Sequence, residues 1–171
     1  IYAPLSERMG MNYIRDELED LSFQELNPEA RNLIVERLSL NKKDREKTFK
    51  EISKNFEKVL TEKKVNTKIM GREKTPFSIW RKMQSRRISL EQLTDIIGFR
   101  VIVDNIQTCY EVLGIFHSTW SMIPGRFKDY ISTPKINNYK SLHTAIIGPN
   151  KERIEIQIRT QQMHEFAERG I

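Results

Sequence analysis

Hydrophobic side chains in the first part of the chain recur at helical spacing. In residues 4–26 they form one rough apolar stripe, which predicts a single helix. Asn27 and Pro28 then give a helix start signal, because asparagine caps a helix and proline suits its first position. A helical pattern follows to residue 63 and allows a break near residues 39–41. We find no arrangement of side chains for chemistry in residues 1–63.

After residue 64 the pattern changes to alternating strand and helix signals. Strands are predicted at residues 65–70, 97–103, 141–148 and 153–159, helices at 76–87, 105–120 and 160–169, and a short helix or turn at 90–96. Ile154, Ile156 and Ile158 alternate strictly with polar residues, so we expect them to pack on helices while the opposite face stays open. Residues 97–103 are largely apolar, which is typical of a strand buried on both faces. We therefore predict an α/β (α+β) fold, a mixed sheet flanked by helices and preceded by a helical segment.

The composition narrows the class of protein. The chain has 171 residues, of which 38% are hydrophobic and 30% charged, and no apolar run reaches the length of a membrane span. Its single cysteine, Cys109, excludes an internal disulfide and a cysteine-based metal site, and it fits a cytoplasmic, reducing compartment. The chain starts at Ile1 rather than methionine, so we expect a piece of a longer protein.

The formal net charge of +6 indicates an anionic partner such as a nucleotide, a nucleic acid or a membrane surface. Much of this charge lies in helices of mixed sign, where a solvated surface explains it equally well. The charge alone therefore does not choose between these partners.

Residues 124–144 concentrate groups that bind polyphosphate. The stretch reads PGRFKDYISTPKINNYKSLHT, and proline, glycine and asparagine signals divide it into turns, so we predict a long loop. Its candidate binding groups are Arg126, Lys128, Lys135, Lys140 and His143, with Tyr130 and Tyr139 as faces for a base. Long loops inside compact domains are usually functional or disordered, and the aromatic content favours function.

A second set of charged residues lies outside this loop. Arg72, Lys74, Arg81 and Lys82 surround the start of the predicted helix at residue 76, and Gly71 permits a sharp turn before it. Asp95 lies just before the predicted strand at residues 97–103, and Glu155 lies on the polar face of the strand at residues 153–159. Two carboxylates, together with substrate phosphates, are enough to bind Mg²⁺. Taken alone, solvated carboxylates and exposed basic helix faces explain the same pattern.

Together these motifs resemble the synthetase domain of the RelA/SpoT homologue (Rel) family, the bacterial (p)ppGpp synthetases. The matching stretches between Gly71 and Arg169 are GREKTPFSIWRKMQ, LTDIIGFRVIV, CYEVLGIFHSTW, the loop itself and RIEIQIRTQQMHEFAERGI. The start, YAPLSERMGMNYIRDELEDLSF, is similar to the tail of the family's hydrolase domain. We therefore expect residues 1–63 to be a hydrolase remnant with connecting helices and residues 64–171 to be the synthetase domain, without alarmone hydrolase activity.

The resemblance implies a nucleotidyltransferase (polymerase-β)-like fold and a GTP diphosphokinase of the stringent response. Such an enzyme transfers pyrophosphate from ATP to the 3′-OH of GTP or GDP and releases AMP, with Mg²⁺ as cofactor. Carried over by position, the implied residues are Glu155 and Asp95 for catalysis and metal, Arg72, Lys74 and Lys82 for ATP, and Lys128, Tyr130, Lys135, Asn137, Tyr139 and His143 for GTP or GDP. The stretch from Arg126 to Asp129 matches the basic motif typical of bifunctional members.

One departure and two alternatives stay open at this point. Asn138 stands where the family has glycine, although asparagine tolerates left-handed backbone better than other residues with a side chain. The first alternative is a catalytically silent module that binds guanine nucleotides, and the second, on charge alone, is a basic RNA-binding domain. Ribosomal or intramolecular regulatory contacts through missing regions are expected partners, whereas membrane and DNA are not.

Overall fold

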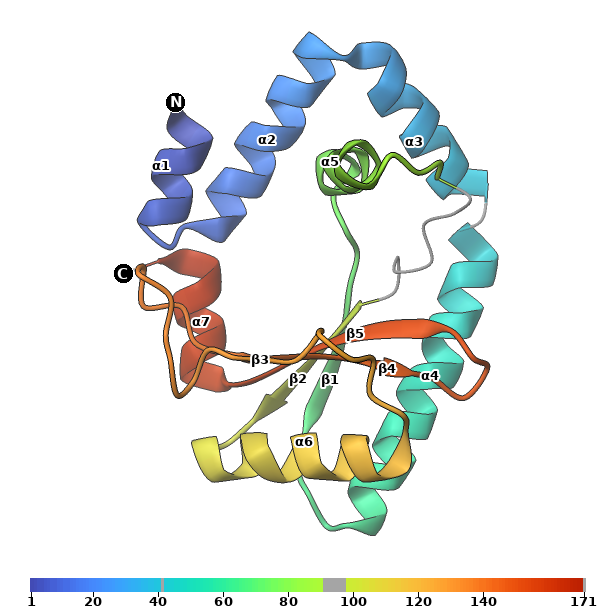
Figure 1. Ribbon diagram of the computed structural model, residues 1–171, viewed down its shortest axis with the longest axis vertical. Coiled ribbons are helices and arrows are strands. Elements are labelled where there is room, and N and C mark those ends of the chain that lie inside the picture. Colours follow the sequence, from blue (N-terminus) through green and yellow to red (C-terminus); the bar gives the residue numbers. More distant parts are fainter. Residues whose placement is uncertain (41, 91–97, 171) are drawn as a thin grey trace.

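The computed structural model describes residues 1–40, 42–90 and 98–170 (Figure 1). Its helices are α1 (Tyr2–Arg8), α2 (Asn12–Leu26), α3 (Pro28–Leu40), α4 (Lys42–Glu62), α5 (Pro76–Arg86), α6 (Ile106–Thr119) and α7 (Gln161–Arg169). Its strands are β1 (Lys68–Arg72), β2 (Gly98–Val103), β3 (Lys128–Asp129), β4 (Leu142–Ile147) and β5 (Arg153–Thr160). The predicted α+β class is confirmed. Apart from residue 90, the predicted helix or turn at residues 90–96 lies outside the described residues.

Within the described residues, the strands form one mixed sheet in the order β1-β2-β5-β4-β3. The central pair β2 and β5 is parallel, and the other neighbouring pairs are antiparallel. The predicted hairpin of β4 and β5 is confirmed, and Lys151 in its turn has a φ of 64°. The predicted loop is confirmed over most of its length, and only β3 and the start of β4 interrupt it.

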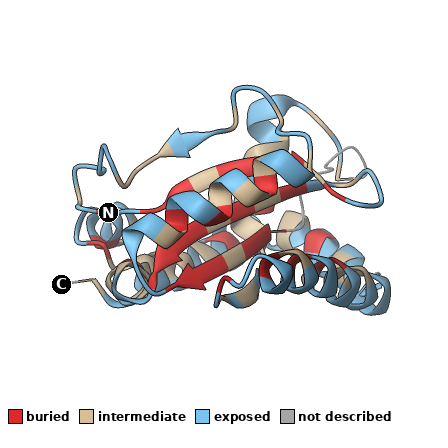
Figure 2. Ribbon diagram, turned by 90° about the horizontal axis from the view of Figure 1, so that it is seen from below, coloured by how far each residue is buried: buried red, intermediate tan, exposed pale blue. Residues whose placement is uncertain are grey.

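One face of the sheet is buried under α4 and α6. Ile154, Ile156 and Ile158 of β5 are at most 1% exposed there, which confirms their predicted packing on helices. Figure 2 shows the sheet largely in the colour of buried residues behind the helix that crosses it. Fully burying each such side chain contributes about 1.5–3 kcal/mol, so this face accounts for much of the stability of the fold.

Helix α4 belongs to the same hydrophobic core as the sheet. Its residues Ile52, Phe56 and Leu60 are at most 1% exposed, and they recur at the spacing of one helical face. The Phe56 ring lies 5.1 Å from that of Phe99 on β2 and 4.9 Å from that of Phe116 on α6. The proposed boundary between residues 63 and 64 stays a prediction, but this core extends across it.

The single helix predicted for residues 4–26 is wrong, because the chain breaks between α1 and α2. Gly10 has a φ of 76°, a left-handed conformation that glycine adopts without steric cost. Helices α1 and α2 meet at this break and pack against each other (Figure 1). Apolar residues recur at helical spacing on both sides of Gly10, so the sequence pattern did not reveal the break.

Helices α1–α3 pack on one another and on α4, α5 and α7 rather than on the strands, and α7 packs against β2 and β5. Phe23 of α2, Ile34 of α3 and Ile79 of α5 form a second, smaller core. Asn12 Nδ2 at the start of α2 donates a hydrogen bond of 2.7 Å to the carbonyl of Ala167 in α7. None of the helices in the described part of the chain is long and apolar enough to cross a membrane. Helix α7 therefore covers part of the polar face at β2 and β5, and cavities open over the rest of that face.

Candidate functional site

The register of the strands places candidate residues from distant parts of the sequence on one face of the sheet. Gly98 on β2 is the neighbour of both Arg72 on β1 and Glu155 on β5. One row further, His143 on β4 lies opposite Gln157 on one side and Lys128 on the other. Because side chains alternate along strands, this register puts Arg72, Glu155, His143 and Lys128 on the open face.

Two polar cavities meet on this open face. The acceptor cavity, of about 470 Å³, is lined by Arg126, Lys128, Tyr130, Lys135 and His143 among others. The donor cavity, of about 530 Å³, is lined by Ser78, Arg81, Lys82 and residues of β1 among others. Both cavities share Arg72, Lys74, Arg86 and Glu155. The site can therefore hold two anionic ligands side by side with a carboxylate between them.

Glu155 is held between two ammonium groups. Its Oε2 lies 2.8 Å from Lys74 Nζ and its Oε1 lies 3.5 Å from Lys82 Nζ. The side chain of Glu155 is 34% exposed, whereas those of the lysines are only 11% and 17% exposed. These three side chains therefore meet at one point. The convergence predicted from the sequence was that of Glu155 with Asp95, and it stays a prediction because Asp95 lies outside the described residues.

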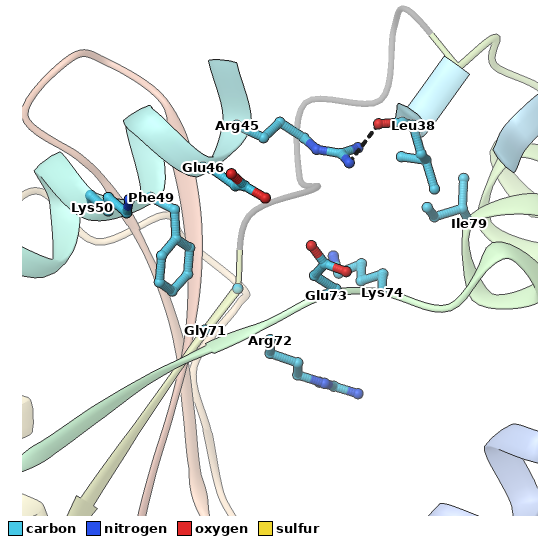
Figure 3. A pocket seen from close by; sticks show the side chains of 11 residues that line it. Leu38, Arg45, Glu46, Phe49, Lys50, Gly71, Arg72, Glu73, Lys74 and Ile79 are labelled. Carbon is cyan, nitrogen blue, oxygen red and sulfur yellow. Dashed lines mark hydrogen bonds between the residues drawn. The ribbon is translucent and has the colours of Figure 1, made fainter. Parts of the chain in front are cut away.

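The donor cavity receives Arg72 and Lys74 because β1 is fixed from behind. The Phe49 ring stacks on Phe99 at 4.4 Å and covers Gly71, where an added Cβ would lie 2.2 Å from Phe49 Cζ. Figure 3 shows Phe49 and Arg72 on opposite sides of the strand. The sharp turn predicted for Gly71 is therefore wrong: glycine is needed here because an aromatic ring packs directly on the backbone.

Helix α5 begins directly after Lys74 and carries Lys82 to the same carboxylate. Thr75 caps the helix by accepting a hydrogen bond of 3.2 Å from the backbone N–H of Ser78. Arg81, the neighbour of Lys82, pairs instead with Glu19 at 3.7 Å and lies over the Phe77 ring. Of the two adjacent cations, only Lys82 therefore reaches Glu155.

In residues 124–144, the acceptor loop, two tyrosines and a histidine pack edge to face. Tyr139 is 8% exposed, and its hydroxyl lies 2.8 Å from His143 Nε2. The Tyr130 ring lies 6.1 Å from that of Tyr139 and 5.1 Å from that of His143. Lys135 Nζ lies over both tyrosine rings, at 5.0 and 5.1 Å from their centroids. The faces predicted to stack a base are thus arranged around one lysine.

His143 is a neutral hydrogen-bonding group in this arrangement. Burial, reinforced by the positive charges of Lys135 and Arg72, lowers the pKa of His143 to about 3. Near neutral pH its ring therefore holds Tyr139 in place and adds no positive charge to the cavity.

The turn that precedes Tyr139 tolerates the asparagine found in place of glycine. Asn138 has a φ of 58°, and its N–H donates a hydrogen bond of 2.8 Å to the carbonyl of Lys135. Asn137 accepts a hydrogen bond of 3.2 Å from the N–H of Tyr139 and donates one of 2.9 Å to the carbonyl of Glu7 in α1. The tolerance predicted for Asn138 is confirmed, and Asn137 connects the loop to the N-terminal helices.

Sequence reasoning missed a buried charged cluster beside the acceptor loop. Arg159 is 1% exposed, and its Nη2 lies 2.7 Å from His164 Nδ1 and 3.1 Å from Glu168 Oε1. Arg100 also contacts Glu168, at 3.1 Å, and burial together with Arg159 lowers the pKa of Arg100. The alternation of β5 placed Arg159 on the correct face, but it gave no sign that α7 would cover it. Conversely, Lys140 lines a different cavity, beside the starts of α6 and α7.

Comparisons with known proteins show what the chain is similar to. A family model described as "Region found in RelA / SpoT proteins" matches residues 71–171. The whole chain is 49% identical over 171 residues to GTP pyrophosphokinase rsh of Brucella melitensis and 46% identical over 171 residues to a GTP pyrophosphokinase of Myxococcus xanthus. It spans only 23% of the length of each. A solved GTP pyrophosphokinase family protein from Streptococcus pneumoniae is similar with a TM-score of 0.57 and 29% identity, over 71% of this chain and 68% of that one.

Proposed function

The chain belongs to the RelA/SpoT family, and on that premise we propose that it carries GTP diphosphokinase activity. It would transfer pyrophosphate from ATP to the 3′-OH of GTP or GDP and release AMP, which is alarmone synthesis in the cytoplasm. The observation that carries this proposal is the meeting of two cation-lined cavities at one carboxylate, Glu155. The names of the relatives, which are GTP pyrophosphokinases, support the same activity.

We assign ATP to the donor cavity. Lys74 and Lys82 supply point charges for its phosphates, and the planar guanidinium of Arg72 suits stacking on adenine. When ATP binds, its phosphates compete with Glu155 for the two lysines. The ion pairs between Glu155 and these lysines support a position for the transferred phosphates beside this carboxylate.

We assign GTP or GDP to the acceptor cavity, with Lys128, Tyr130 and His143 along its wall. Tyr139 and Asn137 line a smaller neighbouring cavity, of about 150 Å³, which shares Lys135 and His143 with the acceptor cavity. Guanine stacking on Tyr139 there requires Lys135 to leave the ring face that it covers. The released ammonium group then meets the nucleotide phosphates, so one movement provides both a stacking surface and a cation. Stacking a base on an aromatic ring contributes about 1–3 kcal/mol. Asn137 beside this ring completes the proposed set.

Glu155 is the proposed general base of the transfer. The ribose 3′ oxygen attacks the β-phosphorus of ATP while its proton passes to the carboxylate of Glu155. The bond from the β-phosphorus to the oxygen that bridges it to the α-phosphorus breaks, and AMP leaves. Reactions of this kind depend mainly on positioning and charge neutralisation, which the shared wall of the two cavities supplies.

The residues fit a magnesium ion that arrives with substrate phosphates. Mg²⁺ prefers hard oxygen ligands and keeps waters, so few carboxylates suffice. The described residues contain no group of three or more candidate ligands, and Glu155 is the carboxylate at the junction of the cavities. We propose Glu155 and Asp95 as the ligands. When bound, the ion would neutralise charge on the transferred phosphates.

A nucleotide assay tests the proposed function. The protein is incubated with ATP, GTP and Mg²⁺, and the nucleotides are separated by anion exchange. We expect equal amounts of AMP and of a guanosine product more anionic than GTP. Guanine nucleotide binding by calorimetry without AMP formation would contradict the enzyme and favour a silent binding module. Steeply salt-dependent RNA binding that GTP does not displace would favour the RNA-binding alternative.

A further inference from the structure

Asp129 lies on the opposite side of β3 from the acceptor cavity. Its neighbours Lys128 and Tyr130 both line that cavity, whereas its own carboxylate faces helix α6. There, Asp129 Oδ2 accepts a hydrogen bond of 2.8 Å from the hydroxyl of Tyr110. The side chains that line the cavity and the one that faces the helix therefore alternate along one short segment.

The same carboxylate also closes the turn that follows β3. Asp129 Oδ1 accepts hydrogen bonds of 2.9 Å from the backbone N–H groups of Ile131 and Ser132. Although burial opposes it, the hydrogen bonds from Ser132, Tyr110 and Ile131 lower the pKa of Asp129. Asp129 is thus a charged acceptor of hydrogen bonds from Tyr110, Ile131 and Ser132.

Strand β3 makes few backbone hydrogen bonds to the rest of the sheet. It consists of two residues, paired with Leu142 and His143 of β4, and the next N–H, of Tyr130, donates to the carbonyl of Ser141 at 3.0 Å. Helix α6, in contrast, is anchored by Cys109, Val112 and Phe116, each 0% exposed. The bond from Tyr110 ties a short, weakly paired strand to a fixed element of the core.

We propose that the Tyr110–Asp129 hydrogen bond is a latch that positions Lys128 and Tyr130 for the guanine nucleotide, which makes Tyr110 a positioning residue for this substrate. The proposal rests on the proposed function for the identity of the ligand. Tyr110 lines neither cavity, so it acts on the acceptor cavity through its contacts with Asp129 and Ser132. Loss of the latch loosens one wall of the acceptor cavity and leaves the donor cavity unchanged.

The test compares Tyr110→Phe, which removes only the hydroxyl, with Tyr13→Phe, a matched change at a tyrosine that is 65% exposed on α2. We expect Tyr110→Phe to raise the KM for GTP about fivefold to tenfold, as for loss of one hydrogen bond to a charged group. The KM for ATP and kcat should stay at wild-type values, as should all parameters of Tyr13→Phe. Equal changes in both KM values, or no change in either, would overturn the latch.

A second pair of variants separates the latch from general loosening. Asp129→Asn keeps an acceptor for the two backbone N–H groups and can donate to Tyr110, so GTP affinity should stay near that of the wild type. Asp129→Ala removes every contact and should weaken GTP binding more than Tyr110→Phe does. In the double variant Tyr110→Phe/Asp129→Ala the tyrosine change should add nothing, and full additivity would overturn the coupling.

Calorimetric titration with GTP keeps this proposal separate from the activity. If the wild type binds GTP but forms no AMP, the proposed enzymatic activity is contradicted. The ratio of the GTP affinities of the wild type and Tyr110→Phe still tests the latch. A wild-type chain that neither binds GTP nor forms AMP overturns both. Hydrogen exchange at the amides of Ile131 and Ser132 gives a further readout, which Tyr110→Phe should accelerate and Tyr13→Phe should not.

Discussion

The two walls of the site are built in different ways. The donor wall, residues 71–86, consists of the end of β1 and helix α5, and a buried aromatic stack supports it from behind. The acceptor wall, residues 124–141, consists of turns around the two residues of β3, fixed by hydrogen bonds to α1, α6 and β4. The comparison teaches that the donor side is set by regular local structure, whereas the acceptor side depends on tertiary contacts and can adjust to its ligand.

The largest selective effect is expected on the donor wall. Lys82→Ala removes a mostly buried ammonium group, so the KM for ATP should rise about tenfold to hundredfold, as for loss of a charge-assisted bond. The KM for GTP should hardly change, because Lys82 does not line the acceptor cavity. Initial-rate kinetics with each nucleotide varied in turn measure both values, and Lys58→Ala on the exposed side of α4 is the control. A larger change in the KM for GTP than in the KM for ATP would contradict the assignment of the two walls to different nucleotides.

The rigid support of the donor wall is tested by adding one methyl group. Gly71→Ala places a Cβ within 2.2 Å of the Phe49 ring, so the free energy of unfolding should fall by about 1–3 kcal/mol. Gly114→Ala in α6 is the matched control: its Cβ meets open space, and alanine should stabilise the helix by about 0.5–1 kcal/mol. Urea unfolding followed by circular dichroism distinguishes the two. Equal stabilities of both variants would show that Phe49 does not restrain β1.

A smaller effect is expected at the adjustable acceptor wall. Lys135→Ala removes a cation from the nucleotide phosphates but also uncovers the rings of Tyr130 and Tyr139, so the two consequences partly cancel. The KM for GTP should rise about threefold to tenfold, which is less than the effect of losing one full charge-assisted hydrogen bond. The KM for ATP should not change. Lys140→Ala, which lines a different cavity, is the control and should match the wild type. An equal effect of the two variants would remove Lys135 from the acceptor site.

The donor wall could be predicted from sequence more fully than the acceptor wall. The predicted start of a helix at residue 76 grouped Lys74 with Lys82, and the alternation of β5 placed Glu155 on the open face. These signals are local in the sequence, so the periodicity of helices and strands is enough to predict them. The reason for Gly71 was missed, because it depends on Phe49 in a helix more than 20 residues earlier in the sequence.

On the acceptor side, the sequence showed the residue types but not their contacts. Asn138 in a left-handed turn was predictable from its chemistry. The Tyr110–Asp129 bond, the contact of Asn137 with α1 and the burial of Arg159 join segments with no shared pattern. The break at Gly10, which brings α1 to this loop, was also concealed by continuous apolar spacing.

The central claim is that the two walls hold their nucleotides on either side of one catalytic carboxylate, that of Glu155. The variant Glu155→Gln tests this claim most directly. The amide keeps the shape of the side chain but cannot take the proton of the 3′-OH, so kcat for AMP formation should fall about 10²–10⁴-fold. Calorimetric affinities for GTP and for a non-hydrolysable ATP analogue should stay near wild-type values, and Glu57→Gln on the surface of α4 should change nothing. A wild-type kcat in Glu155→Gln, or a loss of nucleotide binding equal to the loss of turnover, would contradict the account.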